Sequence, residues 1–85
     1  MWYIYFLESR INNNWIYVGS TNDLKRRLAE HISGKSKTTR KFLPVTLVAY
    51  IAVKTGRQAR NLEKYLKVGS GKAILKKRIL SDEAL

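Results

Sequence analysis

The residues best suited to chemistry in the first half of this chain are a tyrosine, an arginine and the only histidine. Arg27 and His31 are four residues apart, so a helix places them one turn apart on the same edge. Tyr17 belongs to a strand-like run just before that helix. The planar fork of an arginine pairs with two phosphate oxygens, so a phosphate can lie among these three side chains. Their types and spacing indicate a site that can bind a phosphate.

Glu63 is the candidate metal ligand. It follows Ala59 by four residues on a predicted helix, at the flank of the apolar stripe. A carboxylate in that position is partly buried, and a buried carboxylate requires a cation. Mg²⁺ commonly uses one or two carboxylates and keeps several waters, so a substrate phosphate would complete the site. Spacing alone favours the alternative, a solvated Glu63–Lys67 pair.

Each remaining candidate also has a structural alternative. Arg27 can cover the apolar stripe with its stem, and His31 can interact with the helix dipole. Tyr5 and Tyr17 can be core residues of a sheet with their hydroxyls in water. A free phenol has a pKa of about 10 and is a poor base at neutral pH, unless Arg27, a lysine or a metal lowers that pKa.

The elements that position these residues follow from periodicity and from turn residues. Residues 2–8 are apolar on both faces, which predicts a central strand covered on both sides. Ser20, Thr21 and Asn22 are all suitable N-caps, and Ser20 with Asp23 has capping-box spacing. Gly34 is a suitable C′ residue. The predicted elements are strands at 2–8, 15–19 and 45–53, helices at 22–33, 57–67 and 72–80, and a basic loop at 35–42.

Two tyrosine triplets give the chain a family resemblance. Tyr3-Ile4-Tyr5 precedes Tyr17-Val18-Gly19 by about ten residues, a spacing that the GIY-YIG nuclease superfamily shares. The run Leu24-x-x-Arg27-Leu28-x-x-His31 and the later Glu63 resemble the same family in the same order. The resemblance covers residues 2–67 and is to small stand-alone members with a single domain.

The resemblance implies an α+β fold, with a small three-stranded antiparallel sheet flanked by helices in the order β-β-α-β-α-α. It also implies that Arg27 is catalytic, that Glu63 holds one Mg²⁺ or Mn²⁺, and that Tyr5 or Tyr17 is the general base with His31 assisting. Two departures stand out. Tyr3 replaces the glycine of the first triplet, and the Asn that many members carry after the metal ligand is missing.

The charge of the chain predicts a polyanionic partner. The net charge is +11 on 85 residues, which favours nucleic acid over an acidic membrane surface. The chain has no cysteine and hence no disulfide or thiolate site. Its apolar start is too short for a membrane span and unlike a signal peptide, so we expect a cytoplasmic protein that forms one domain over residues 1–85. The expected backbone contacts are Lys35, Lys37, Arg40, Lys41, Lys72 and Lys76, with Lys77 and Arg78 beside them.

The sequence therefore predicts a metal-dependent endonuclease, with DNA favoured over RNA as its substrate. The alternative is a nucleic-acid-binding module of the same fold that is catalytically weak or inactive, which the missing Asn supports. A membrane-surface protein is a weaker third hypothesis, since no predicted helix has the broad apolar face that it needs. The chain is too short for a separate targeting domain, so DNA structure or a protein partner would direct it.

Overall fold

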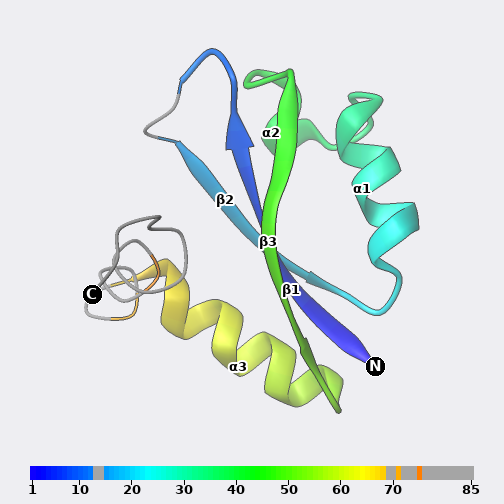
Figure 1. Ribbon diagram of the computed structural model, residues 1–85, viewed down its shortest axis with the longest axis vertical. Coiled ribbons are helices and arrows are strands. Elements are labelled where there is room, and N and C mark those ends of the chain that lie inside the picture. Colours follow the sequence, from blue (N-terminus) through cyan, green and yellow to red (C-terminus); the bar gives the residue numbers. More distant parts are fainter. Residues whose placement is uncertain (13–14, 69–70, 72–74, 76–85) are drawn as a thin grey trace.

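The computed structural model describes residues 1–12, 15–68, 71 and 75, and Figure 1 shows the arrangement of their helices and strands. A three-stranded sheet runs through the middle, with α1 and α2 on one side and α3 on the other. The elements are β1 (Trp2–Ser9), β2 (Ile16–Thr21), α1 (Leu24–Ile32), α2 (Lys37–Arg40), β3 (Val45–Val53) and α3 (Gly56–Lys67).

The sheet confirms the predicted α+β class. Its strand order is β2-β1-β3, and both neighbouring pairs are antiparallel. β1 lies in the centre, as its apolar residues on both faces predict. In the register, Tyr5 pairs with Gly19 of β2 and with Tyr50 of β3. Because alternate residues of a strand point to opposite faces, these three positions form one row on the α1 side.

The two faces of the sheet have separate cores. On the α3 side, Ile4 and Phe6 are fully buried against Ala59 and Leu66 of the helix. On the α1 side, Tyr5 and Leu7 pack with residues of α1 and of the segment around Phe42 and Leu43. Each face of β1 is thus covered by a different helix layer.

The beginning of α1 differs from the prediction. Asp23 is the N-cap, and its side chain accepts a hydrogen bond from the backbone N–H of Arg26. Ser20 and Thr21 still belong to β2, because the pairing with β1 extends to Tyr3 opposite Thr21. The predicted capping box from Ser20 is therefore wrong. The predicted end is confirmed, since Gly34 has a φ of 84°, which favours glycine.

The segment after α1 also contains an element that the sequence did not predict. Residues 35–42 were expected to be a loop, but four of them form the short helix α2. The third strand has the predicted bounds, and α3 begins one residue earlier than predicted. The predicted last helix over 72–80 lies outside the described residues. Within the described part of the chain, no helix is long and apolar enough to cross a membrane.

Candidate active site

A chain of three buried polar groups lies between the sheet and α1. The hydroxyl of Tyr5 is 2.8 Å from Nε2 of His31, and Nδ1 of His31 is 2.8 Å from Oγ1 of Thr39 on α2. Tyr5 is 1% exposed, and the other two residues are completely buried. Both ring nitrogens thus have a partner, which fixes the orientation of the imidazole.

Tyr17 and Arg27 complete this group on the same side of the sheet. The ring of Tyr17 lies 5.0 Å from the ring of His31 and 6.0 Å from that of Tyr5, measured between centroids. Tyr17 is half-buried and therefore more accessible than Tyr5. Nη1 of Arg27 forms a 2.8 Å ion pair with Glu30, one helical turn away. The structure thus brings together four of the five predicted catalytic residues.

Gly19 allows the close packing of the two tyrosines. A Cβ atom at this position would lie 2.6 Å from both Cζ and the hydroxyl oxygen of Tyr5, and 2.9 Å from Cε2 of Tyr17. Real Cβ atoms essentially never make such contacts, so a larger residue would displace the Tyr5 ring. The glycine that ends the second triplet is therefore required by the space that the phenols occupy.

Burial determines the protonation of the Tyr5–His31 pair. It raises the pKa of Tyr5 well above that of a free phenol, and Tyr17 adds to this effect, while the nearby guanidinium of Arg27 acts in the opposite direction. Burial also lowers the pKa of His31, and the positive charge of Arg27 lowers it further. At neutral pH, the pair therefore consists of a protonated phenol and a neutral imidazole.

Arg27 is charged at neutral pH and pairs with Glu30. The hydrogen bond from Arg27 lowers the pKa of Glu30, and the same bond raises the pKa of Arg27. Both side chains are about one third exposed, so this pair is screened by solvent and is easily exchanged for another anion. The guanidinium can thus be transferred from the carboxylate to a phosphate.

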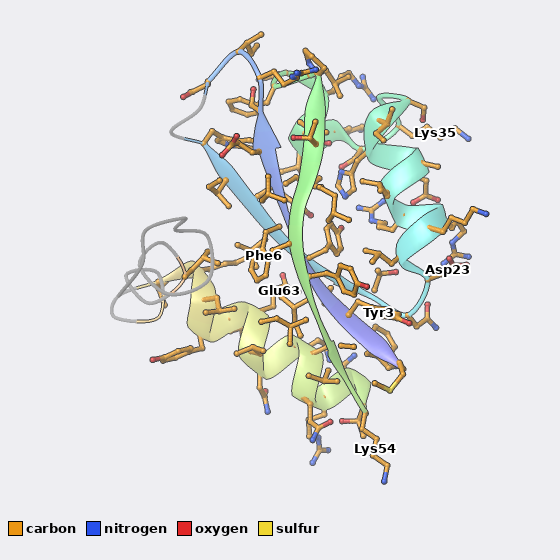
Figure 2. The ribbon with its side chains drawn as sticks, in the orientation of Figure 1. Tyr3, Phe6, Asp23, Lys35, Lys54 and Glu63 are labelled. Carbon is orange, nitrogen blue, oxygen red and sulfur yellow. The ribbon has the colours of Figure 1, made fainter. Side chains whose placement is uncertain are left out.

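Glu63 lies on α3, on the opposite side of the sheet. One carboxylate oxygen accepts a 2.5 Å hydrogen bond from the hydroxyl of Ser20 on β2, and the other forms a 2.6 Å ion pair with Lys67. Figure 2 shows Glu63 between the sheet and α3, on the same side as Phe6, whereas Tyr3 and Asp23 lie on the α1 side. The Glu63–Lys67 pair that spacing alone favours is present.

The outer edge of β2 connects the two sides. β2 is an edge strand, so a molecule at this edge can contact side chains from both faces. A cavity of about 350 Å³ follows this edge, lined by Tyr17 and Val18 of β2, Thr38 of α2 and Lys67 of α3. Ser20, which binds Glu63, directly follows the Gly19 that packs on Tyr5. The carboxylate and the phenols thus lie on two sides of one strand end.

The donor set for a metal ion is small. No group of three or more His, Cys, Asp or Glu side chains gathers into a metal site within the residues that the structure describes. Glu63 offers one carboxylate, which is compatible with Mg²⁺ if waters and a substrate phosphate supply the other oxygens. The ammonium group of Lys67 now neutralises this carboxylate, and a divalent cation would take its place.

The predicted backbone-binding residues divide into two groups. Lys35, Lys37, Arg40 and Lys41 are all exposed, and they lie on α2 and its flanks. α2 also carries Thr39, the partner of His31, so this basic segment adjoins the polar cluster. Lys72, Lys76, Lys77 and Arg78 lie outside the described residues.

Three residues of the site were not predicted from the sequence. Thr39 appeared to belong to a basic loop, and Ser20 appeared to be a helix cap, yet they hold His31 and Glu63 in place. Glu30 pairs with Arg27 at i, i+3 spacing. Only this last contact has a local sequence signal, because a helix brings residues three apart together.

The fold and the family comparison together define a nuclease-type catalytic domain. A family model described as the GIY-YIG catalytic domain matches residues 1–78. The chain belongs to the GIY-YIG family. Nucleases of this family are generally dependent on a divalent metal ion.

Relatives of the chain occur in several bacteria. A UPF0213 protein of Cupriavidus necator is 40% identical over 63 residues, which are 73% of this chain and 66% of that protein. A UPF0213 protein of Streptococcus pneumoniae is 42% identical over 66 residues, which are 76% of this chain and 65% of that protein. The chain thus spans slightly less than two thirds of the length of these relatives. No solved structure matches it significantly.

Proposed function

We propose that this chain is a metal-dependent endonuclease that hydrolyses phosphodiester bonds, with DNA as its first candidate substrate. The observation that carries the proposal is the hydrogen-bonded series Tyr5–His31–Thr39 beside Arg27, at a strand edge whose other side holds Glu63. A buried imidazole that fixes the orientation of Tyr5, next to an exchangeable guanidinium, suits a site that holds a phosphate beside oriented phenols.

The roles of the α1-side residues follow from their burial. Arg27 releases Glu30 and binds the scissile phosphate through its fork, stabilising the charge that develops during hydrolysis. Tyr17 is the more accessible phenol, so it meets the attacking water, and Tyr5 connects it to His31. If Nδ1 of His31 donates to Thr39, Nε2 is free to accept a hydrogen bond from the hydroxyl of Tyr5. His31 thus holds the buried, protonated Tyr5 in place against Tyr17, and the Tyr17 hydroxyl is the group that faces the attacking water.

Glu63 is the residue that would hold the metal ion. Ser20 orients its carboxylate, and Lys67 keeps it neutralised until the ion binds. When bound, the divalent cation neutralises phosphate charge and makes a water more acidic. The exposed lysines and arginine around α2 bind the nucleic acid backbone and give affinity without sequence specificity.

A second candidate function is binding without hydrolysis. One specific observation favours it: both oxygens of Glu63 are already engaged, by Ser20 and Lys67, on the side of the sheet opposite to the phenols. The missing Asn after Glu63 supports it as well. In this case the basic surface would still bind nucleic acid, and binding would weaken steeply with salt.

The deciding experiment is plasmid nicking with Mg²⁺ or with EDTA. We expect cleavage with Mg²⁺ only, and a loss of roughly 100-fold or more in Arg27→Ala and in Glu63→Gln, as is typical when a group that stabilises transition-state charge is removed. Arg26→Ala and Glu8→Gln are the matched controls, because they remove an exposed arginine and a β1 carboxylate outside the site. Equal activity in the two site variants and the controls contradicts the proposal. Salt-sensitive binding without any cleavage supports the second candidate.

A further inference from the structure

A second hollow lies on the α1 side of the sheet, beyond the candidate active site. Its volume is about 490 Å³, within the range of ligand pockets. It is lined by Tyr3 and Tyr50 from the sheet, Leu24 and Leu28 from α1, and Leu47 from β3. We call this hollow the Tyr3–Tyr50 groove. Most of its lining is apolar or aromatic, and Asn22, Asp23 and Lys25 complete it. The mechanism proposed above does not use this groove.

The groove continues directly from the polar cluster. Tyr50 pairs with Tyr5 across β1 and β3, so the two residues are neighbours on one face. Tyr3 lies on the same face of β1, two residues before Tyr5, which is roughly 6.6 Å along a strand. Arg27 directly precedes Leu28, which lines the groove, so a nucleotide whose phosphate binds Arg27 would have its neighbour within reach of the groove.

The tyrosines of the groove are arranged for contact with a flat ring. Tyr50 is 55% exposed, although it lies on a strand beside an apolar hollow. Its ring meets that of Tyr3 edge to face, with 5.9 Å between centroids and 70° between planes. An edge-to-face pair leaves ring surface uncovered, and bases stack on such surfaces whatever their identity. Tyr3 stands where the resembled family has a glycine, which has no ring.

The charges around the groove suit an anionic polymer. Lys25 is exposed at the rim, and the whole chain carries a net charge of +11. Asp23 also lies at the rim, but one of its oxygens is occupied by the N–H of Arg26 at the start of α1, and Arg26 lies 4.0 Å from the other. An aromatic hollow with a lysine at its rim fits a base together with its phosphate.

We propose that the Tyr3–Tyr50 groove binds an unpaired nucleobase next to the scissile phosphate. Tyr50 stacks on the base, Tyr3 closes the groove at one end, and Lys25 contacts the attached phosphate. A paired base within a duplex cannot enter, since its faces are covered by its neighbours. The groove therefore selects single-stranded, frayed or extruded nucleotides. This inference rests on the proposed function, because it takes nucleic acid as the substrate.

The test is binding without cleavage, measured by fluorescence anisotropy in EDTA. Two labelled oligomers of equal length are compared, oligothymidylate and an oligomer of abasic sites, which has the same phosphates but no bases. We expect the wild type to bind oligothymidylate more tightly, by roughly 5- to 150-fold per stacked base. Tyr50→Ala should abolish this preference and leave the affinity for the abasic oligomer unchanged. Tyr50→Trp should preserve it.

The matched control is Tyr65→Ala, which removes a tyrosine that is 46% exposed on α3, on the other side of the sheet. It should bind both oligomers as the wild type does. A wild type without base preference overturns the inference, even if it cuts plasmid and the proposed function stands. The inference is also overturned if Tyr65→Ala reduces the preference for oligothymidylate as much as Tyr50→Ala does. A base preference in a protein that never cleaves plasmid supports the groove and contradicts the nuclease. Binding to neither oligomer overturns the groove, whether or not the protein cuts plasmid.

Discussion

The two faces of the central strand β1 differ in what they bury. Ile4 and Phe6 face α3 and are surrounded by apolar side chains, whereas Tyr5 faces α1 and buries a hydroxyl against His31. Successive residues of one strand thus serve two different environments. The apolar side chains on the α3 face can be buried without hydrogen-bond partners, whereas each buried polar atom on the α1 face must keep one.

This difference separates most of the candidate site from the α3-side core, and Glu63 of α3 is the exception. The apolar side chains around Ile4 and Phe6 on the α3 face stabilise the fold, since burial of apolar surface is the main favourable term in folding. The polar face holds side chains that hydrogen bonds orient, and among the described residues no buried side-chain N or O lacks a hydrogen-bond partner. Changes on the first face should therefore affect unfolding, and changes on the second should affect the geometry of the site.

The largest effect on stability is expected for Phe6→Ala. Phe6 is fully buried in the α3-side core, and truncation of such a ring destabilises a protein by about 3–5 kcal/mol. Urea unfolding followed by circular dichroism measures the change, with the exposed Tyr65→Ala as control. A loss below about 1 kcal/mol would show that the α3 face is not the main core.

A smaller loss of stability, with a larger effect on the site, is expected for Gly19→Ala. The new methyl group meets Tyr5 at 2.6 Å, so the ring must move and its bond to His31 is strained or broken. Overpacking together with the lost hydrogen bond should cost roughly 2–4 kcal/mol. The NMR signals of His31, the only histidine, report the geometry directly. Unchanged histidine signals in the folded variant would contradict the close packing described here.

The smallest effect is a pH dependence from His31. The pKa of His31 is lowered in the folded state, mainly by burial. Once the pH falls below 6.5, the ordinary pKa of histidine, the unfolded chain therefore binds more protons than the folded chain. Stability is therefore complete above that pH and decreases as the pH falls through the lowered pKa, with a slope of at most about 1.4 kcal/mol per pH unit for one proton.

Urea midpoints between about pH 8 and pH 5 measure this dependence, and His31→Gln is the variant that cannot titrate there. Phe6→Ala, if it folds, should retain the slope, because it changes only the other face. A wild type whose histidine titrates at or above its ordinary pKa would show that the imidazole is not buried as a neutral group.

Much of the fold follows from local sequence. The apolar residues on both faces of β1 indicate its central position, and the Leu24–Leu28 spacing indicates α1. The boundary between β2 and α1 does not follow, because Ser20, Thr21, Asn22 and Asp23 are all cap-forming residues. The length of the β1–β2 pairing selects among them, and that pairing depends on residues far apart in the sequence.

The site shows the same division. Tyr5 and Tyr17 meet because Tyr5 pairs with Gly19, and Tyr17, two residues before Gly19, points to the same face of the sheet. Arg27 and His31 share a helix edge. Neither the burial of Thr39 nor the position of Glu63 has a local signal, because both depend on how helices pack on the sheet. The sequence therefore predicted the α1-side cluster and left open how the carboxylate of α3 is held.

The open edge of β2 has one further consequence. A site that is entered from the side of a sheet accepts the middle of a long polymer, and no free terminus has to be threaded through it. Closed circles and linear molecules should then dock equally well, and both products can depart laterally without any hinge or flap having to move.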